Sequence, residues 1–234
     1  MMKIASYNIH KAVGTDRRRS PERIIEVLNE VGADVVALQE ADMRFGLRHA
    51  VLPDWLLEAH SPYRRVPLAI QAGSMGWHGN AILVRDGVEV IGHDALHLPC
   101  LEPRGAVSAA VSLGGVALRL FGMHLDLSGL WRRRQAAALL HHVEIANSHG
   151  VPLPSIIVGD TNEWSQNGGC LRDFGRQFAI VSCGRSFHAR RPIASLDRIM
   201  VGAGLTLHEA GVHSSPLSRR ASDHLPVWAV LDRG

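Results

Sequence analysis

The chain has few cysteines and almost no lysine, and it lacks any long apolar run. Its three cysteines, Cys100, Cys170 and Cys183, are far apart and form no C-x-x-C pair, which argues against a zinc knuckle or a disulfide framework. No apolar stretch approaches the roughly 20 residues that a membrane-spanning helix needs. The first residues enter a strand pattern without a signal-peptide apolar region. We therefore expect a cytoplasmic protein with free thiols and no transmembrane segment.

Arginine carries almost all of the positive charge, because lysine occurs only at positions 3 and 11. The arginines cluster at 17–19, 64–65, 132–134, 190–191 and 219–220. A guanidinium group can bind two phosphate oxygens at once, whereas an ammonium group acts as a point charge. The clusters favour a phosphate-bearing substrate, although each of them is also compatible with a solvated surface.

Length and composition indicate one globular domain over residues 1–234. Of the 234 residues 46% are hydrophobic and 20% are charged, and the sequence has no internal repeat or low-complexity tract. Ser20-Pro21 starts a predicted helix that Gly32 ends, with apolar residues at helical spacing between them. Further helices are predicted at about 53–59 and 130–149.

The remaining pattern predicts ten short strands. They cover residues 3–8, 34–39, 80–84, 88–92, 106–113, 116–123, 155–159, 197–201, 205–212 and 226–231. So many strands with so few helices do not fit one doubly wound sheet. They favour an α/β fold in which two β-sheets pack together with helices outside them.

Oxygen-rich side chains stand at the ends of four of these strand patterns. Asn8 and Glu40 follow the first two, Asp160 follows 155–159, and the pair Asp223-His224 leads into 226–231. Such side chains can converge at one edge of a sheet, and oxygen ligands are what Mg²⁺ prefers. The repeated arrangement predicts a metal-dependent enzyme.

Two of these segments also carry groups suited to proton transfer. Asp160 and Asn162 are alternate residues, so both can face one place, where one group accepts a proton or binds metal and the other orients water or phosphate. An Asp-x-Asn sequence is also a common turn. Neighbouring residues on a strand point to opposite sides, so Asp223 would not orient His224. Asp197, which precedes an apolar run, is the natural partner for His224 as a base.

Four further residues are candidate phosphate donors. His124 ends a strand pattern, and Asn80 and Arg104 stand near the starts of two others. Arg132 lies with two more arginines in the first turn of the predicted helix 130–149. The helix dipole disfavours cations there, and a bound anion would relieve the cost.

The order of these segments resembles that of the endonuclease/exonuclease/phosphatase superfamily, whose fold is DNase I-like, over essentially the whole chain. The matching segments are Ser6-Tyr7-Asn8, Leu38-Gln39-Glu40, Gly79-Asn80-Ala81-Ile82-Leu83, Arg104-Gly105-Ala106, Met123-His124-Leu125, Gly159-Asp160-Thr161-Asn162, Leu196-Asp197-Arg198-Ile199 and Ser222-Asp223-His224-Leu225-Pro226-Val227. The resemblance implies a four-layer α-β-β-α sandwich, in which helices flank two mixed β-sheets and the site lies at one end.

The resemblance also implies roles for individual residues. Glu40 matches the principal Mg²⁺ ligand and Asn8 its neighbour, and Asp223 is a candidate for completing a second ligand set. Mn²⁺ is an alternative ion. Asp160 and Asn162 match the residues that place the attacking water and the phosphate.

The other implied roles concern proton transfer and phosphate binding. Asp197 and His224 match a carboxylate–histidine pair, and His124 matches a phosphate-binding histidine. Family members differ over whether the aspartate or the histidine is the base, and over one metal ion or two. The sequence leaves both questions open, together with the oligomeric state.

The expected activity is hydrolysis of a phosphate ester by in-line attack of activated water, on a small-molecule or lipid-like substrate. A DNA endonuclease or exonuclease using the same site is the alternative, and a catalytically inactive binding module is a third reading. The abasic-site repair branch has an active-site tyrosine before its second long helix, whereas this chain has only Tyr7 and Tyr63. Signature segments of the inositol-phosphatase and deadenylase branches are also missing, so the ester remains unassigned.

Overall fold

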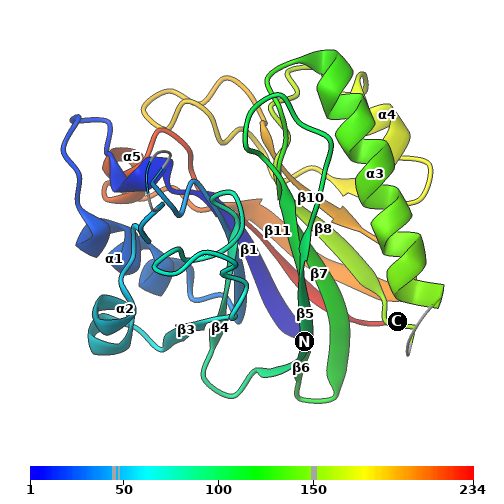
Figure 1. The fold of residues 1–234 in the computed structure, drawn as a ribbon, viewed down its shortest axis with the longest axis horizontal. Coiled ribbons are helices and arrows are strands. Elements are labelled where there is room, and N and C mark those ends of the chain that lie inside the picture. The colour runs from blue at the N-terminus through cyan, green and yellow to red at the C-terminus, as the bar shows by residue number, and fades with distance from the viewer. Residues whose placement is uncertain (44–45, 47, 149–151) are drawn as a thin grey trace.

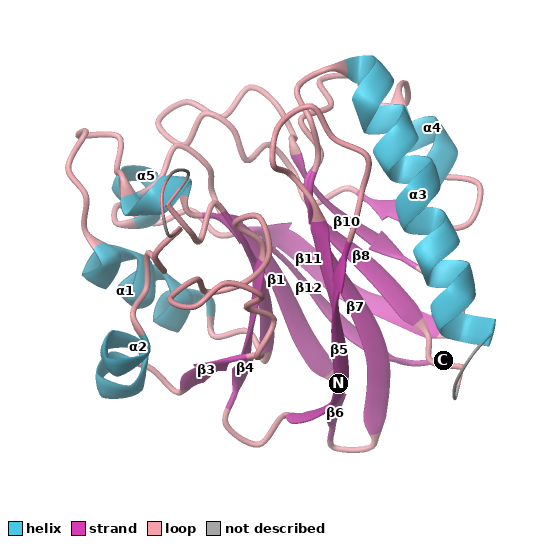
Figure 2. Cartoon of the chain, viewed as in Figure 1, coloured by secondary structure: helices cyan, strands magenta, loops and turns pink. Residues whose placement is uncertain are grey.

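The computed structural model describes residues 1–43, 46, 48–148 and 152–234. These residues form two six-stranded sheets with helices on their outer faces (Figures 1 and 2). The first sheet consists of β1 (Met2–Asn8), β2 (Val35–Gln39), β3 (Tyr63–Arg65), β4 (Ala81–Arg85), β11 (Leu205–Val212) and β12 (Val227–Arg233). The second consists of β5 (Glu89–Leu96), β6 (Ala106–Leu113), β7 (Val116–His124), β8 (Ser155–Asp160), β9 (Ala179–Val181) and β10 (Asp197–Val201). The helices are the 3₁₀ helix η1 (His10–Ala12) and the α-helices α1 (Pro21–Val31), α2 (Asp54–His60), α3 (Gly129–Ser148), α4 (Cys170–Phe174) and α5 (Ser218–Ala221).

Three hydrophobic clusters hold the four layers together. One lies between the sheets, one joins α1, α2 and α5 to the first sheet, and one joins α3 and α4 to the second. Strand β2 shows how the sequence produces this arrangement. Val35 and Ala37 face the other sheet while Val36 and Leu38 face the helices, because successive strand residues point to opposite faces. The structure confirms the four-layer α-β-β-α sandwich.

Each sheet is mixed and contains one parallel pair of strands. Strands β1 and β2 are parallel in the first sheet, and β7 and β8 are parallel in the second. Helix α1 makes the first crossover and α3 the second. In the first sheet the order is β11-β12-β1-β2-β4-β3, and in the second it is β5-β6-β7-β8-β10-β9. The same β-α-β unit therefore occurs in both sheets.

Helix α1 begins and ends where its sequence signals predict. The Ser20 hydroxyl accepts a hydrogen bond from the Arg23 N–H, Pro21 occupies the first turn, and Gly32 adopts the left-handed conformation that ends the helix. Its apolar face is buried against the first sheet.

The other predicted helices also form, with ends that differ from the prediction by a residue. Helix α2 is Asp54–His60 where 53–59 was expected, and α3 is Gly129–Ser148 where 130–149 was expected; position 149 lies outside the described residues. The ten predicted strands all form. The prediction omitted β3, β9, α4 and α5, which are only three to five residues long and give little periodic signal.

Candidate active site

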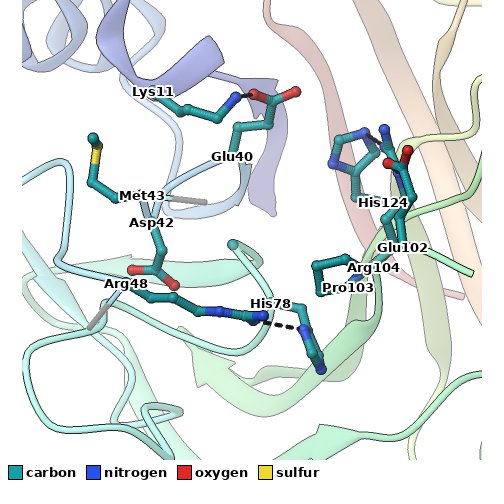
Figure 3. Close-up of a pocket in the computed structure, with 11 residues that line it drawn as sticks. Lys11, Glu40, Asp42, Met43, Arg48, His78, Glu102, Pro103, Arg104 and His124 are labelled. Carbon is teal, nitrogen blue, oxygen red and sulfur yellow. Dashed lines mark hydrogen bonds and ion pairs between the residues drawn. The ribbon is translucent and has the colours of Figure 1, made fainter. Parts of the chain in front are cut away.

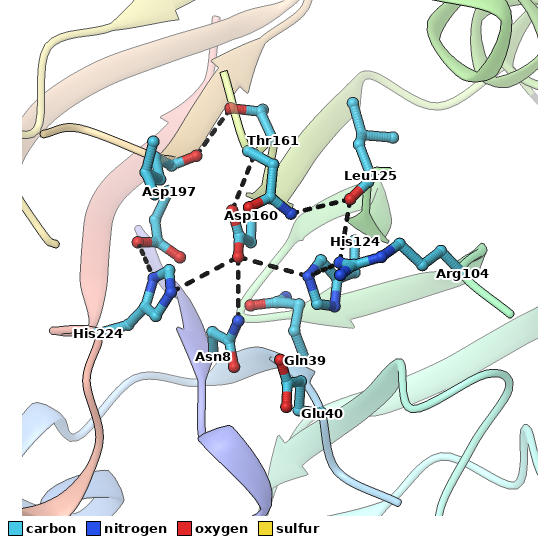
Figure 4. Close-up of polar contacts among 12 residues, drawn as sticks. Asn8, Gln39, Glu40, Arg104, His124, Leu125, Asp160, Thr161, Asp197 and His224 are labelled. Carbon is cyan, nitrogen blue, oxygen red and sulfur yellow. Dashed lines mark hydrogen bonds and ion pairs between the residues drawn. The ribbon is translucent and has the colours of Figure 1, made fainter. Parts of the chain in front are cut away.

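Six strands bring polar side chains to one edge of the two sheets. Asn8 and Glu40 lie at the carboxyl ends of β1 and β2, and His124 and Asp160 are the last residues of β7 and β8. Strands β10 and β12 run antiparallel to their neighbours β8 and β1, so Asp197 and His224 reach the same edge from strand starts. Figure 4 shows these side chains pointing toward one another.

Asp160 is the centre of this arrangement. Its side chain is buried, and its Oδ2 accepts a hydrogen bond from Asn8 Nδ2 across the gap between the sheets (3.0 Å). The same oxygen lies 3.5 Å from His124 Nε2 and 3.7 Å from His224 Nε2. Oδ1 accepts from the backbone N–H of Asn162 (2.9 Å). One carboxylate thus contacts groups from four strand ends (Figure 4).

Gly159 allows β7 and β8 to pair this closely beside the site. Its φ is +147°, and a Cβ added there would lie 1.9 Å from the Met123 carbonyl oxygen. The pairing aligns His124 with Asp160 in the parallel register. A residue with a side chain at 159 would separate the strand ends that carry these two groups.

His224 and Asp197 form a buried pair. Asp197 Oδ2 lies 2.8 Å from His224 Nδ1 and also accepts from the Ser186 hydroxyl, and the Phe187 ring packs against the imidazole. Burial alone would lower the pKa of His224, but Asp197 and Asp160 outweigh it and raise this pKa to about 10. The structure places Asp197 where an orienting carboxylate for His224 is expected.

His124 is held in the opposite charge state. It is buried, and burial lowers its pKa to about 4 even though Asp160 opposes this shift. The Arg104 guanidinium contacts its Nε2 and also donates to the Leu125 carbonyl (3.1 Å). Because arginine only donates, Nε2 of the neutral ring must accept. Of the two histidines near the Asp160 carboxylate, His124 is therefore neutral and His224 is protonated.

Glu40 supplies negative charge on the first sheet. Its carboxylate contacts the Lys11 ammonium on η1. Burial disfavours its charged form, but His124 and Lys11 outweigh this effect and lower the pKa of Glu40 to about 2. Nearby, Asn8 Oδ1 accepts from the His10 N–H (3.1 Å). An ionised carboxylate beside an amide oxygen is a donor set that fits Mg²⁺ or Mn²⁺.

Asp160, Asp197 and the deprotonated form of His224 offer a second place for a cation. Their ligand atoms all lie within 4.8 Å of one another. Asp197 Oδ1 is buried and has no hydrogen-bond partner among the described residues, although His224 Nδ1 already faces Asp197 Oδ2. The Asp223 carboxylate faces His10 Nδ1 at 3.7 Å, and its part in a second ligand set stays a prediction.

The remaining predicted residues are engaged by the protein itself. The Asn162 amide donates to the Leu125 carbonyl (2.9 Å). The Asn80 amide donates to the Trp77 and Gly105 carbonyls (3.3 and 3.1 Å), and so links the two segments that carry them. The structure does not bring Asn80 into the group around Asp160, and its role in phosphate binding stays a prediction.

Two of the three arginines in the first α3 turn pair with carboxylates, and the third, Arg134, lies over the Trp131 ring. Arg132 Nη2 lies 3.2 Å from Glu163 Oε2, and Arg133 Nε lies 3.2 Å from Asp173 Oδ2. These acids offset part of the charge at the helix start, a cost that a bound anion was also expected to relieve. Arg132 thus already has an acidic partner, and its role in phosphate binding stays a prediction.

Sequence reasoning missed three residues that shape the site. Lys11 contacts Glu40, Ser186 contacts Asp197, and Phe187 packs on His224. The rarity of lysine in this chain was a signal for Lys11, because it is one of two and stands three residues after Asn8. Ser186 and Phe187 lie in a loop whose pattern carries no comparable signal.

None of the helices in the described ranges is long and apolar enough to cross a membrane. No curated protein matches the sequence.

Several solved structures share this fold at low sequence identity. The mannosyl-6-phosphatase of Bacteroides thetaiotaomicron is 18% identical with a TM-score of 0.76, covering 99% of both chains. The human Nocturnin catalytic domain with bound sulfate is 17% identical with a TM-score of 0.75, covering 100% of this chain and 94% of that one. D. rerio TDP2 in complex with a single-strand DNA product is 17% identical with a TM-score of 0.72, covering 99% and 98%.

At these identities the likeness establishes the fold alone, but the sequence itself gives a stronger result. Residues 5–224 match the Endonuclease/Exonuclease/phosphatase family. The match spans nearly the whole chain and includes every candidate site residue described above. The chain therefore belongs to the endonuclease/exonuclease/phosphatase family.

Proposed function

We propose that this hydrolase cleaves phosphate esters by in-line attack of water. Glu40 and Asn8 would bind Mg²⁺ or Mn²⁺, and residues 1–234 would form one domain. The observation that carries the proposal is the position of Asp160. Its carboxylate lies among His224, His124 and the amide of Asn8, which belongs to the proposed cation site. Such a group can orient a water molecule and accept its proton. A cation bound at Glu40 would neutralise charge on the phosphoryl and leaving oxygens.

The geometry favours Asp160 over His224 as the base. Both ring nitrogens of His224 face carboxylates, Asp197 at 2.8 Å and Asp160 at 3.7 Å, which stabilises the imidazolium form. An imidazolium donates to a phosphoryl oxygen and cannot accept a proton. In this scheme the water oxygen bonds to phosphorus, its proton moves to Asp160, and the bond to the leaving oxygen breaks.

A screen of phosphate esters with and without Mg²⁺ tests the proposal. It should include an aryl phosphomonoester, an aryl phosphodiester and plasmid DNA, each assayed with Mg²⁺ and with chelator. We expect chelator-sensitive turnover of at least one ester. Turnover that is equal in chelator would contradict the metal assignment, and no turnover of any ester would contradict hydrolysis.

A nuclease is the second candidate because three arginine clusters converge beside the site. Thr15 connects them: its N–H donates to the Arg220 carbonyl (3.0 Å), and its own carbonyl accepts from the Arg190 side chain. The exposed arginines of this surface are Arg17, Arg18, Arg19, Arg190, Arg191, Arg219 and Arg220. Asp16 neutralises only part of this charge, through Arg220 (3.0 Å) and Arg23 (2.8 Å).

The plasmid arm of the screen distinguishes this candidate when it is run at two salt concentrations. Arginines that contact a nucleic-acid backbone release condensed counterions, so binding weakens steeply as salt rises. A nuclease should lose DNA cleavage at the higher salt while keeping aryl ester hydrolysis. Equal salt sensitivity of both reactions would remove the argument for the arginine surface.

Replacing Asp197 by asparagine should lower kcat by about 10²-fold, because general acid–base and orienting groups contribute on this scale. Mg²⁺ affinity, measured by calorimetry, should change much less. The variant also removes the negative charge that raises the pKa of His224, so the imidazole should titrate at lower pH than in the parent protein.

NMR of the His224 ring in metal-free protein measures this shift directly. Because the pKa of His224 is higher in the folded protein than in the unfolded chain, protonation of His224 adds to the free energy of unfolding. This contribution is complete below about pH 6.5 and is lost as the pH rises through about 10. Asp197→Asn should therefore cost the most stability at neutral and lower pH. Asp86→Asn, in the exposed turn after β4, is the matched control. Equal losses of rate and metal affinity would remove the orienting role.

A further inference from the structure

A pocket adjoins the polar centre on the side of Glu40 and His124. Its walls include Lys11 with Glu40 and Arg104 with His124, and Arg48 with His78 forms another part of the wall (Figure 3). Glu40, Arg104 and His124 belong to both this pocket and the polar centre in Figure 4. We call it the Arg48 pocket. A substrate bound at the centre has direct access to it.

Arg48 and His78 form a fixed pair within the pocket. Arg48 Nη1 donates to His78 Nδ1 at 2.8 Å, so Nδ1 must be the acceptor and the ring proton must lie on Nε2. The edge of Trp77 packs against the imidazole with ring centroids 4.1 Å apart. Burial, with Arg48, lowers the pKa of His78 and keeps the ring neutral.

Asp42 anchors the loop that carries His78. Its buried carboxylate accepts hydrogen bonds from the backbone N–H groups of Met75 (2.5 Å) and Gly76 (3.4 Å). The Trp77 and Asn80 backbones also bond to each other (2.8 and 2.9 Å). The pair in the wall of the pocket is therefore held by the fold before any ligand binds.

Among the described residues that line the pocket, Arg48 is the cation for which no ion pair is found. Lys11 contacts Glu40, and Arg104 Nε lies 3.5 Å from Glu102 Oε2. Within the described ranges no carboxylate lies within ion-pair distance of the Arg48 guanidinium; Asp42, which also lines the pocket, accepts hydrogen bonds from backbone N–H groups. An anion entering this pocket would find a donor that has no acid within ion-pair distance among the described residues.

In-line attack decides which part of the substrate enters the pocket. In the proposed mechanism the attacking water would lie at Asp160, so the leaving oxygen would depart on the opposite side of the phosphorus. Glu40, where we propose that the cation binds, lines the Arg48 pocket. Resting on the proposed hydrolysis, we propose that the Arg48 pocket binds the leaving group, and that Arg48, oriented by His78, selects leaving alcohols that carry a second anionic group. A carboxylate or phosphate of a small molecule would satisfy it, and so would the neighbouring phosphate of a nucleic-acid strand.

Matched substrates test the selection. One pair consists of aryl phosphates whose leaving phenol carries either a para-carboxylate or an uncharged para-carboxamide. The other consists of a thymidine trinucleotide, whose departing piece can carry a second phosphate, and the dinucleotide, whose departing nucleoside has none. We expect the parent enzyme to favour the anionic member of at least one pair. Arg48→Gln should reduce that preference at least about tenfold, as expected for a lost charge-assisted hydrogen bond. Arg48→Lys should restore part of it.

The control variant is Arg85→Gln, an exposed arginine at the far end of β4, which should leave the preference unchanged. Loss of preference in the aryl pair identifies a small-molecule source, and loss in the nucleotide pair identifies a nucleic-acid source. An unchanged preference in both pairs, or none in the parent enzyme, would overturn the assignment of Arg48 while leaving hydrolysis intact.

Binding separates failure of the pocket from failure of hydrolysis. Calorimetry with para-hydroxybenzoate and para-hydroxybenzamide, the two leaving phenols, requires no turnover. The parent protein should bind the benzoate more tightly, and Arg48→Gln should remove the difference. Equal binding of both phenols by the parent protein, together with no preference in the trinucleotide pair, would refute the pocket even if an ester is cleaved.

Discussion

Replacement of Asp160 by asparagine is expected to lower kcat by about 10³-fold or more. Asparagine cannot accept the proton of the attacking water, and loss of proton transfer with loss of positioning is worth factors of this size. The amide would also place an N–H₂ group, in one of its two orientations, against the Asn8 donor that now bonds Asp160 Oδ2 at 3.0 Å. Steady-state kinetics on the best ester from the screen measure the loss.

The control separates chemistry from folding. Asp86→Asn makes the same chemical change in an exposed turn, and it should keep kcat within about twofold. Circular dichroism and thermal unfolding show whether Asp160→Asn remains folded. A folded variant that retains more than about a tenth of the parent kcat would exclude Asp160 as the base and would return that role to His224.

Replacement of Glu40 by glutamine should abolish the Mg²⁺ dependence of turnover, with an activity loss of about 10³-fold or more. Glutamine keeps the shape of the side chain but removes the negative charge that a hard cation requires. The parent carboxylate is ionised over the whole working range, since its pKa is lowered to about 2. Calorimetric titration with Mg²⁺ should show weakened binding in the same variant.

Two comparisons make this result interpretable. Glu58→Gln changes an exposed glutamate on α2 and should leave both turnover and Mg²⁺ binding unchanged. Undiminished turnover in folded Glu40→Gln would place the cation elsewhere. The group of Asp160, Asp197 and His224 would then be the next site to test, because its ligand atoms lie within 4.8 Å of one another.

The sequence predicted the architecture well because strand ends and helix caps are local signals. Asn8, Glu40, Asp160 and His224 were recognisable from the strand patterns beside them, and the two-sheet arrangement followed from counting those patterns. Ser20, Pro21 and Gly32 mark the ends of α1 in the sequence as they do in the structure. These features depend on neighbours in the chain, which a single sequence displays.

Contacts between distant segments were less accessible. Arg132 meets Glu163 31 residues away, and the Asn80 amide meets the Gly105 carbonyl 25 residues away. Nothing in the local pattern around either residue shows that its donors are occupied. For the same reason the sequence did not reveal Arg48 and His78, which lie 30 residues apart and contact each other only because the fold brings them into one pocket.

The site residues are divided between two sheets, each with its own β-α-β unit, and this division has a thermodynamic consequence. Asn8 and Glu40 come from one sheet, while His124, Asp160 and Asp197 come from the other, so a ligand that touches both groups recognises only the docked pair of sheets. By mass action, its binding raises the free energy needed to separate the two halves as its concentration exceeds its dissociation constant. The substrate and its cation would therefore act as a reversible cross-link between the layers. The free energy of unfolding should be highest when both are bound.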